Sequence, residues 1–250
     1  KWFRYGWSIE SMLQHVIASA DPAVVTILCE DINSKGSGFL VSGEGHVVTN
    51  NHVVAELALQ GGMLSTSYSR RIAVVIGGRE YPATIANDTS DDRPIVYDYA
   101  ILKVDGLGSP PFLVPGDPEA VRRGDKVVCL GFPLDFDTLI ATDGIVSAVL
   151  RRPSHVNTLH EMRTIVSNAL IQFGNSGGPM LDAESGKVIG INTLSHELRD
   201  VLRQRLETWS AHPSASDFSL LRDLVEYTLK YTYIGLNHAV SIEHVMGDPA

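Results

Sequence analysis

A succession of short β-branched runs, punctuated by glycine, asparagine and aspartate, constrains the fold of this chain more than any other feature. The runs that precede residue 106 read AVVTILCEDI, GSGFLVS, HVVTNNHVV, RIAVVIGG, YPATIAND and YAILKVD. Those that follow residue 118 read DKVVCLGFP, TDGIVSAVLRR, TIVSNAL, GPMLDAESGKVIGINT and YIGLNHAVSI. Strands of this length and spacing are typical of an antiparallel barrel or sandwich. The sequence therefore predicts an all-β fold.

A proline-rich segment divides these runs into two sets. Residues 106–118, GLGSPPFLVPGDP, hold four of the twelve prolines of the chain, which indicates a connection between two units. We expect a first β-barrel at residues 21–112 and a second, packed against it, at residues 113–250. In the second barrel the segment DAESGK predicts a hairpin turn with Gly186 at positive φ.

Two regions carry a helical period instead of a β pattern. Residues 1–20 comprise an aromatic segment followed by SIESMLQHVIASA, in which apolar side chains recur at helical spacing. Residues 196–230 hold two further helical stretches, separated by SAHPSAS. We therefore expect an N-terminal helix and a helical insertion within the second barrel.

Composition narrows the class of protein. Of the 250 residues, 44% are hydrophobic and 20% are charged, which is typical of a globular chain. The formal net charge of −9 argues against binding of nucleic acid through its phosphates, and no apolar run reaches the length of a membrane span. The two cysteines, Cys29 and Cys129, have neither the spacing of a metal site nor the number of a disulfide framework. We expect neither metal nor cofactor, and these features do not indicate a cellular compartment.

Three segments supply the residue types of nucleophilic acyl transfer. GNSGGP at residues 174–179 surrounds Ser176 with glycines, VVTNNHVV places His52 at the end of an apolar strand, and YDYAILKV places Asp98 just before another. A serine hydroxyl becomes a nucleophile when an imidazole accepts its proton and a carboxylate orients that imidazole. Main-chain N–H groups of the glycine loop could stabilise the developing oxyanion. A lone histidine or serine is more often a surface or turn residue, so the prediction depends on all three.

The surroundings of these residues resemble the HtrA (Deg) family of trypsin-like serine proteases. GSGFLVSGEGHVVTNNHVV is similar to that family's stretch around the histidine, and DYAILKV to its stretch around the aspartate. GDKVVCLGFP, TDGIVSAV and GNSGGPMLDAESGKVIGINT resemble consecutive strands of its second barrel. The likeness covers about residues 8–195, resumes at GLNHAVSI, and keeps the order His, Asp, Ser. It implies a chymotrypsin-like fold of two packed six-stranded antiparallel β-barrels.

The resemblance also implies roles for individual residues. His52 would act as general base and then as general acid, with Asp98 as its orienting partner. Ser176 would be the nucleophile that forms an acyl-enzyme. The oxyanion hole would be formed by Gly174, Asn175 and Ser176.

The pocket for the side chain that precedes the cut is expected, by the same resemblance, beside five residues. They are Leu170, Ile171, Ile191, Asn192 and His238. No aspartate occurs in SNALIQF, where a trypsin-type enzyme carries a buried acid, so we expect cleavage after small or medium aliphatic residues. The chain departs from the family pattern at Ser167-Asn168 and at Asn237-His238. His238 either adds polarity to the pocket or is a hydrogen-bonded strand residue.

The expected function is a serine endopeptidase that acts on polypeptides and degrades unfolded or damaged ones. A processing protease with few targets and a non-catalytic chaperone or binding module on the same fold are the alternatives. The segment KWFRYGW predicts a homotrimer contact through Trp2, Phe3, Tyr5 and Trp7, unless its tryptophans pack on their own barrel. We expect no PDZ domain within this chain. The helical insertion is expected to pack on the barrel or to cap the cleft.

Overall fold

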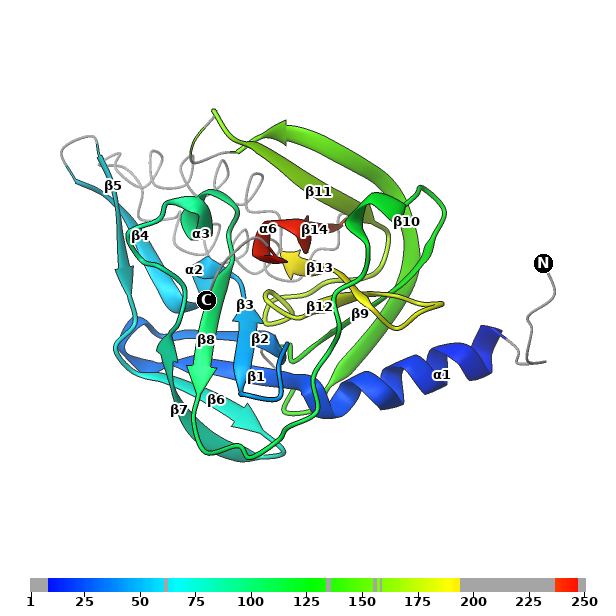
Figure 1. The fold of residues 1–250 in the computed structure, drawn as a ribbon, viewed down its shortest axis with the longest axis horizontal. Coiled ribbons are helices and arrows are strands. Elements are labelled where there is room, and N and C mark those ends of the chain that lie inside the picture. The colour runs from blue at the N-terminus through cyan, green and yellow to red at the C-terminus, as the bar shows by residue number, and fades with distance from the viewer. Residues whose placement is uncertain are drawn as a thin grey trace, which may run out of the picture.

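The first of two closed barrels is built by strands from the N-terminal half of the chain (Figure 1). The computed structural model describes residues 9–60, 63–133, 136–154, 157, 159–193 and 237–246. The strand order in this barrel is β1-β2-β3-β8-β7-β6, and every pairing is antiparallel. The strands are β1 (Val24–Cys29), β2 (Ser34–Leu40), β3 (His46–Thr49), β6 (Ile72–Ile76), β7 (Arg79–Ile85) and β8 (Ala100–Val104).

The second barrel repeats this architecture with the strand order β10-β11-β14-β13-β12-β9. Its strands are β9 (Lys126–Gly131), β10 (Ile140–Pro153), β11 (Glu161–Ser167), β12 (Pro179–Asp182), β13 (Val188–Thr193) and β14 (Asn237–Ser241). The predicted all-β fold of two six-stranded antiparallel barrels is therefore confirmed. The division of the chain between residues 112 and 113 stays a prediction. The turn between β12 and β13 has Gly186 at a φ of 69°, as expected.

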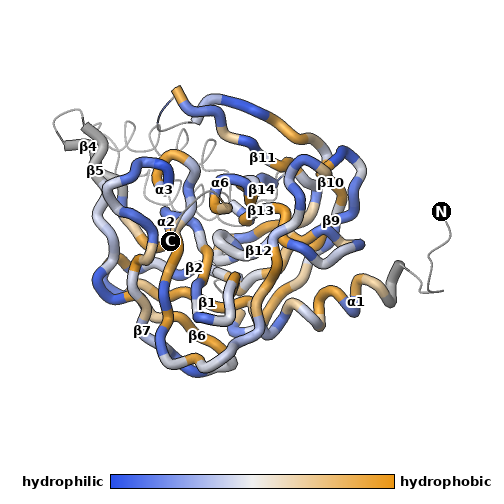
Figure 2. Tube along the Cα trace, viewed as in Figure 1, coloured by the Kyte–Doolittle hydropathy of each residue, from blue (hydrophilic) through white to orange (hydrophobic). Residues whose placement is uncertain are grey.

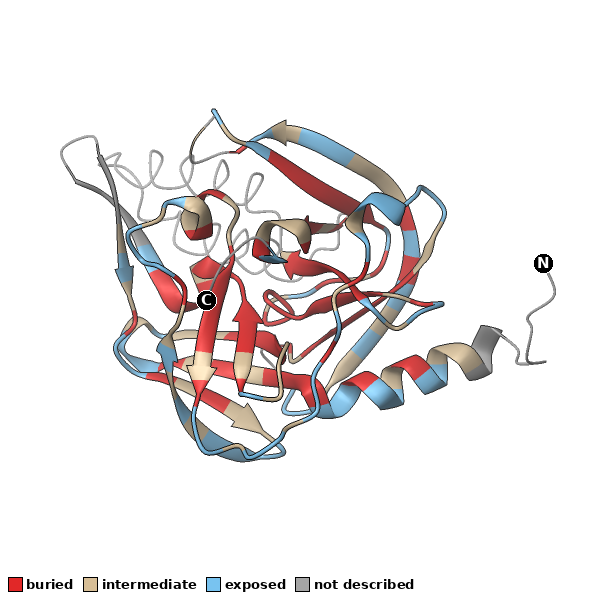
Figure 3. Cartoon of the chain, in the orientation of Figure 1, coloured by how far each residue is buried: buried red, intermediate tan, exposed pale blue. Residues whose placement is uncertain are grey.

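Closure and side-chain alternation explain why these sequences form barrels. A closed barrel leaves no strand edge unpaired, and its inward side chains fill the interior. Figure 3 shows buried residues along the barrel strands, with exposed residues gathered on the turns and on outer positions such as those of β7. One continuous apolar cluster includes Leu102 of the first barrel and Leu130 and Ile191 of the second, all with no exposed surface. The two barrels thus share a core along their contact.

The expected N-terminal helix is α1 (Ile9–Ala20). Figure 2 shows apolar and polar residues alternating along it, and Val16 and Ala20 are buried while Gln14 and His15 are exposed. Val16 lies within 4 Å of the position that a Cβ on Gly186 would take. The apolar face of the helix therefore lies against the β12–β13 turn of the second barrel.

Several short elements were not predicted. A two-stranded hairpin, β4 (Ala55–Gln60) and β5 (Met63–Tyr68), forms its own small sheet. Short helices precede, connect or follow the strands: η1 (Asp21–Ala23), η2 (Glu30–Ile32), α2 (Asn51–Val54), α3 (Arg93–Val96), η3 (Pro118–Ala120) and α6 (Glu243–Met246). The predicted insertion at residues 196–230 and the aromatic residues Trp2, Phe3, Tyr5 and Trp7 lie outside the described residues.

The two cysteines are buried, free and in different barrels. Burial raises the pKa of Cys29 to about 11 and that of Cys129 to about 12, because the low-polarity interior disfavours a thiolate. Both thiols are therefore protonated at neutral pH. No helix in the described parts of the chain has the length and apolarity needed to cross a bilayer.

Candidate active site

His52 lies on α2, immediately after β3 has brought the chain to the contact between the barrels. Its ring Nδ1 is 2.9 Å from Asp98 Oδ2 and 3.1 Å from Asp98 Oδ1. The main-chain N–H of His52 donates to Asp98 Oδ1 at 3.0 Å, and the side-chain amide of Asn50 donates to the main-chain oxygen of Asp98 at 2.8 Å. The β3–α2 junction therefore holds Asp98 by side chain and main chain together.

Asp98 takes a backbone conformation that is rare for a residue with a Cβ. Its φ is 52°, in the left-handed region. It follows the last residues of α3, where the N–H of Tyr99 donates to Pro94 O at 3.0 Å and the N–H of Asp98 donates to Ile95 O at 3.4 Å. This pair of hydrogen bonds is the Schellman ending of a helix, whose left-handed position is usually glycine. Asp98 places a carboxylate beside His52 at a position that glycine usually occupies.

The carboxylate of Asp98 also receives a donor from the second barrel. The hydroxyl of Thr193, the last residue of β13, donates to Asp98 Oδ2 at 3.1 Å. A carboxylate is an acceptor, so we infer that the Nδ1 of His52 carries the ring proton and that Nε2 holds a free electron pair. That tautomer is the one in which the imidazole can accept a proton from a hydroxyl.

Ser176 lies in a loop that is folded against the same junction. Gly174 and Gly177 have φ of 93° and 88°, which the glycines of GNSGGP permit. A Cβ on Gly177 would lie against Ser37 O and Thr49 Oγ1 and 3.1 Å from the N of Asn50. Gly177 is thus in close contact with Thr49, the last residue of β3, which lies three positions before His52. Ser176 itself is 7% exposed.

Ser37 of β2 joins this loop to both barrels. Its N–H donates to Ser176 O at 2.9 Å, and its hydroxyl donates to Gly174 O at 2.6 Å. The same hydroxyl accepts from the N–H of Phe132, which follows β9, at 2.8 Å. One buried residue therefore holds the carbonyl groups on both sides of Asn175, that of Gly174 through its hydroxyl and that of Ser176 through its main-chain N–H.

The three predicted oxyanion-hole residues differ in the state of their N–H groups. The N–H of Asn175 donates to Gln172 O at 3.0 Å and is used within the loop. Within the described parts of the chain, the N–H groups of Gly174 and Ser176 donate to no other main-chain group. These two remain the candidates for stabilising an oxyanion.

The predicted pocket residues fall into two groups by burial. Ile171, Ile191 and Asn192 are at most 3% exposed, and the Asn192 side-chain amide donates to Leu130 O and Pro179 O. Leu170 and His238 are half-buried. His238 pairs with Thr193 across β13 and β14. The second group therefore has side-chain surface that a ligand could contact.

The segment 168–171 is held by three hydrogen bonds that the sequence did not predict. Asn168 Oδ1 accepts from the N–H of Ile145 at 2.8 Å, and Leu170 O accepts from Thr142 Oγ1 at 2.7 Å. The side-chain amide of Asn237 donates to Ala169 O at 2.6 Å. Asn168 and Asn237 are two of the positions that depart from the family pattern, and here both support the expected pocket wall.

Other functional contacts were also missed by sequence reasoning. Ser37, Asn50 and Thr193 each contact Asp98 or the serine loop, and only the stretches GSGF and TNNH offered a signal for the first two. Among the described residues, no group of three or more His, Cys, Asp or Glu side chains could hold a metal ion.

The comparisons with known proteins identify the class of the chain. Residues 36–191 match the trypsin-like peptidase domain family. This match spans more than half of the chain, and the chain therefore belongs to that family.

Within this family the relatives are of HtrA type, which confirms the resemblance. The chain is 36% identical over 163 residues to serine protease HTRA1A of Danio rerio, covering 64% of this chain and 30% of the relative. It is 37% identical over 164 residues to the mitochondrial serine protease HTRA2 of Bos taurus, covering 64% of this chain and 31% of the relative. The solved structure of the HtrA-type protease AlgW with tripeptide has a TM-score of 0.65 at 26% identity, covering 94% of this chain and 61% of that one. The match thus spans less than a third of the length of these curated relatives.

We expect Asp98→Asn to lower kcat for peptide hydrolysis by about 10³–10⁴-fold, because an amide cannot hold the productive tautomer of His52. Asparagine adopts the left-handed region readily, so the free energy of unfolding should change little. Steady-state kinetics and urea unfolding measure the two effects.

Asp92→Asn is the matched control, since Asp92 is exposed and its side chain makes no capping hydrogen bond at the start of α3. It should leave kcat unchanged. If Asp98→Asn lowers kcat by less than about 10-fold, the role assigned to Asp98 is contradicted, because loss of the acid lowers kcat far more in such triads.

Proposed function

We propose that this chain is a serine endopeptidase that hydrolyses peptide bonds through Ser176, His52 and Asp98. The observation that carries the proposal is the paired hydrogen bonding of Asp98 to the ring and main-chain N–H of His52. The packing of the serine loop on the β3–α2 junction supports it. Membership of the trypsin-like peptidase domain family agrees with the same chemistry.

In this mechanism the Nε2 of His52 accepts the proton of the Ser176 hydroxyl as Ser176 Oγ attacks the scissile carbonyl carbon. The imidazolium that forms is stabilised by the carboxylate of Asp98. It then gives its proton to the leaving amine, and an acyl-enzyme remains. Water, activated by His52, releases the acid and regenerates Ser176.

The developing oxyanion would be stabilised by the N–H groups of Gly174 and Ser176. Both groups belong to a loop whose carbonyls are held by Ser37. Donors that are fixed before the reaction need no reorganisation in the transition state, which makes them effective there. Ser37, which has no exposed surface, thereby supports the loop from within.

We test the nucleophile with a fluorophosphonate probe, which phosphonylates an activated serine. The unmodified chain should label, and Ser176→Ala should not. Ser109→Ala, which removes an exposed serine of the connection between the barrels, should label like the unmodified chain. An unlabelled native chain would refute the proposed activity and favour a binding module. Labelling that persists in Ser176→Ala would refute the assignment of Ser176 as the nucleophile.

We propose that the substrates are unfolded or damaged polypeptides cut after small or medium aliphatic residues. Leu170 offers partly exposed apolar surface, and the segment SNALIQF carries no acidic side chain that could pair with lysine or arginine. Apolar side chains are mostly buried in folded proteins, so a pocket that reads them would favour unfolded chains.

A peptide library and casein test this substrate class. Cleavage after alanine, valine, leucine or isoleucine should dominate, and casein should be digested faster than folded proteins of similar size. A strong preference for lysine or arginine would overturn the pocket assignment. Selective cutting of one folded target, with casein spared, would favour a processing protease.

We propose that Trp2, Phe3, Tyr5 and Trp7 hold three copies of the chain together, on the basis of the family resemblance and of four aromatic residues within one short segment. Sedimentation of the whole chain should give the mass of a trimer, and deletion of residues 1–7 should give a monomer. A monomeric mass for both would refute this assembly.

A further inference from the structure

Tyr97, the residue directly before Asp98, is stacked on a histidine from the other end of the chain. Its ring centroid lies 4.0 Å from that of His244, and the two ring planes differ by 13°. Tyr97 closes α3 in the first barrel, whereas His244 lies on α6, which follows the last strand of the second. The stack therefore joins the C-terminal end of the described chain to the residue next to the candidate triad acid.

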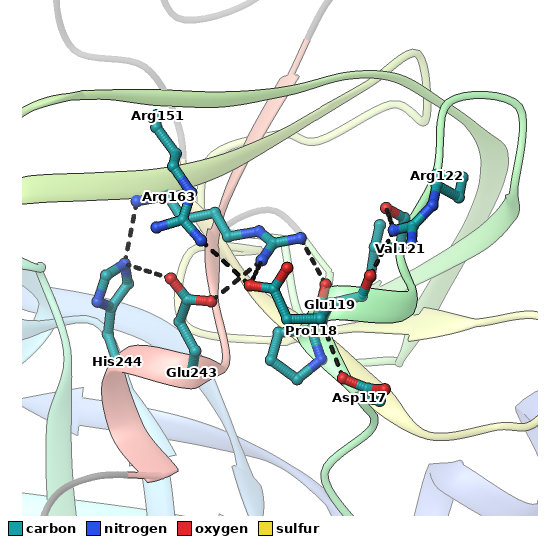
Figure 4. A network of polar contacts seen from close by, with 9 residues as sticks. All are labelled: Asp117, Pro118, Glu119, Val121, Arg122, Arg151, Arg163, Glu243 and His244. Atoms are coloured by element: carbon teal, nitrogen blue, oxygen red, sulfur yellow. Dashed lines mark hydrogen bonds and ion pairs between the residues drawn. The ribbon is translucent and has the colours of Figure 1, made fainter.

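The ring of His244 is held in place from the second barrel (Figure 4). The main-chain N–H of Arg163, on β11, donates to His244 Nε2 at 3.1 Å. The Arg163 side chain is 5% exposed, forms ion pairs with Glu119 and, at 3.3 Å, with Glu243, and donates to Pro118 O at 2.6 Å. A buried arginine with these partners fixes α6 against β11 and η3, and the imidazole with it.

The imidazole of His244 is uncharged at neutral pH. Burial, together with the positive charges of Arg151 and Arg163, lowers its pKa to about 4. Among the described residues, the Glu243 carboxylate and the Tyr97 phenol also lie near the ring. Because Nε2 accepts from Arg163, the ring proton is on Nδ1. The stack is therefore a contact between two uncharged rings.

Two further contacts from the second barrel hold the same short segment. The hydroxyl of Ser154 donates to Val96 O at 2.7 Å. The phenol oxygen of Tyr97 is 3.3 Å from His160 Nδ1, and the two rings are nearly perpendicular, at 86°. Ser154 and His160 flank the turn between β10 and β11. The end of α3 is thus fixed by the second barrel through both main chain and side chain.

We propose that Tyr97 and His244 are positioning residues for the triad. The stack holds the end of α3 so that Asp98 keeps its left-handed backbone and its carboxylate faces His52. A left-handed conformation is unfavourable for a residue with a Cβ, and such a conformation persists only where the surroundings impose it. This inference rests on the proposed function, because positioning matters for catalysis only if Asp98 serves in it.

The experiment compares Tyr97→Leu and His244→Ala, which remove the stack, with Tyr97→Phe and His244→Phe, which keep two flat rings. Tyr81→Leu is the matched control. Tyr81 is a half-buried tyrosine on β7 of the first barrel that packs against the apolar core, and it lies outside α3. All are made in the whole chain, and urea unfolding reports the stability of each.

We expect Tyr97→Leu and His244→Ala to lower kcat about 10-fold with KM changed less than about 2-fold, as for the loss of an interaction that acts in the transition state. The acid limb of the pH–rate profile should move to lower pH, because a displaced carboxylate stabilises the imidazolium less. The two phenylalanine variants should recover most of kcat. Tyr81→Leu should lower stability without moving the pH profile. An unmoved profile in the stack variants would refute the proposal.

A readout without turnover separates this inference from the proposed function. In the Ser176→Ala background, the low-field proton of His52 Nδ1–H reports its hydrogen bond to Asp98 by NMR, and it is assigned by its absence in His52→Gln. We expect that signal to move upfield and to exchange faster in both stack variants. An unchanged signal would refute the positioning role even if the unmodified chain hydrolyses peptides. A chain that neither labels nor cleaves would refute the endopeptidase, while this signal would still decide the role of the stack.

Discussion

The hydrogen bonds of Ser37 join the two barrels at the point on which the site depends. Its N–H and hydroxyl hold the loop of Ser176, and the same hydroxyl accepts from the chain that leaves β9. His52 and Asp98 come from the first barrel, whereas Ser176 and Thr193 come from the second. Neither barrel alone contains the candidate site. The relative position of the barrels, fixed by these bonds and by a shared apolar cluster, is therefore a condition for any chemistry there.

The barrels and their turns could be predicted because the signals for them are local. Alternating β-branched runs define strands, and Gly186 supplies the conformation that the β12–β13 turn requires. Short motifs and their order predicted His52, Asp98 and Ser176 as the triad, and that assignment stays a prediction. The β4–β5 hairpin was missed although Gly61-Gly62, between two runs, is a known hairpin signal. Its strands are mixed in polarity and have no strong period.

The remaining features of the site could not be predicted, because they arise from contacts between distant segments. No pattern around His244 indicates that its ring lies on Tyr97, and nothing near Arg163 indicates Glu119 and Glu243 as partners. The left-handed conformation of Asp98 was equally hidden, since propensity assigns such positions to glycine. At Asn168 and Asn237 the chain departs from the family pattern, and no local signal in the sequence explains these two asparagines. In the structure they are supports for one loop segment.

The position of Asp98 at the end of α3 places two different demands on one residue. At that point the chain keeps an acid where local folding would prefer a smaller or more permissive residue, so chemistry and foldability favour different amino acids. Replacement of Asp98 by glycine would relieve the backbone and remove the carboxylate at the same time. A chain with the same two barrels and without the hydrogen bonds between His52 and Asp98 is therefore one substitution away.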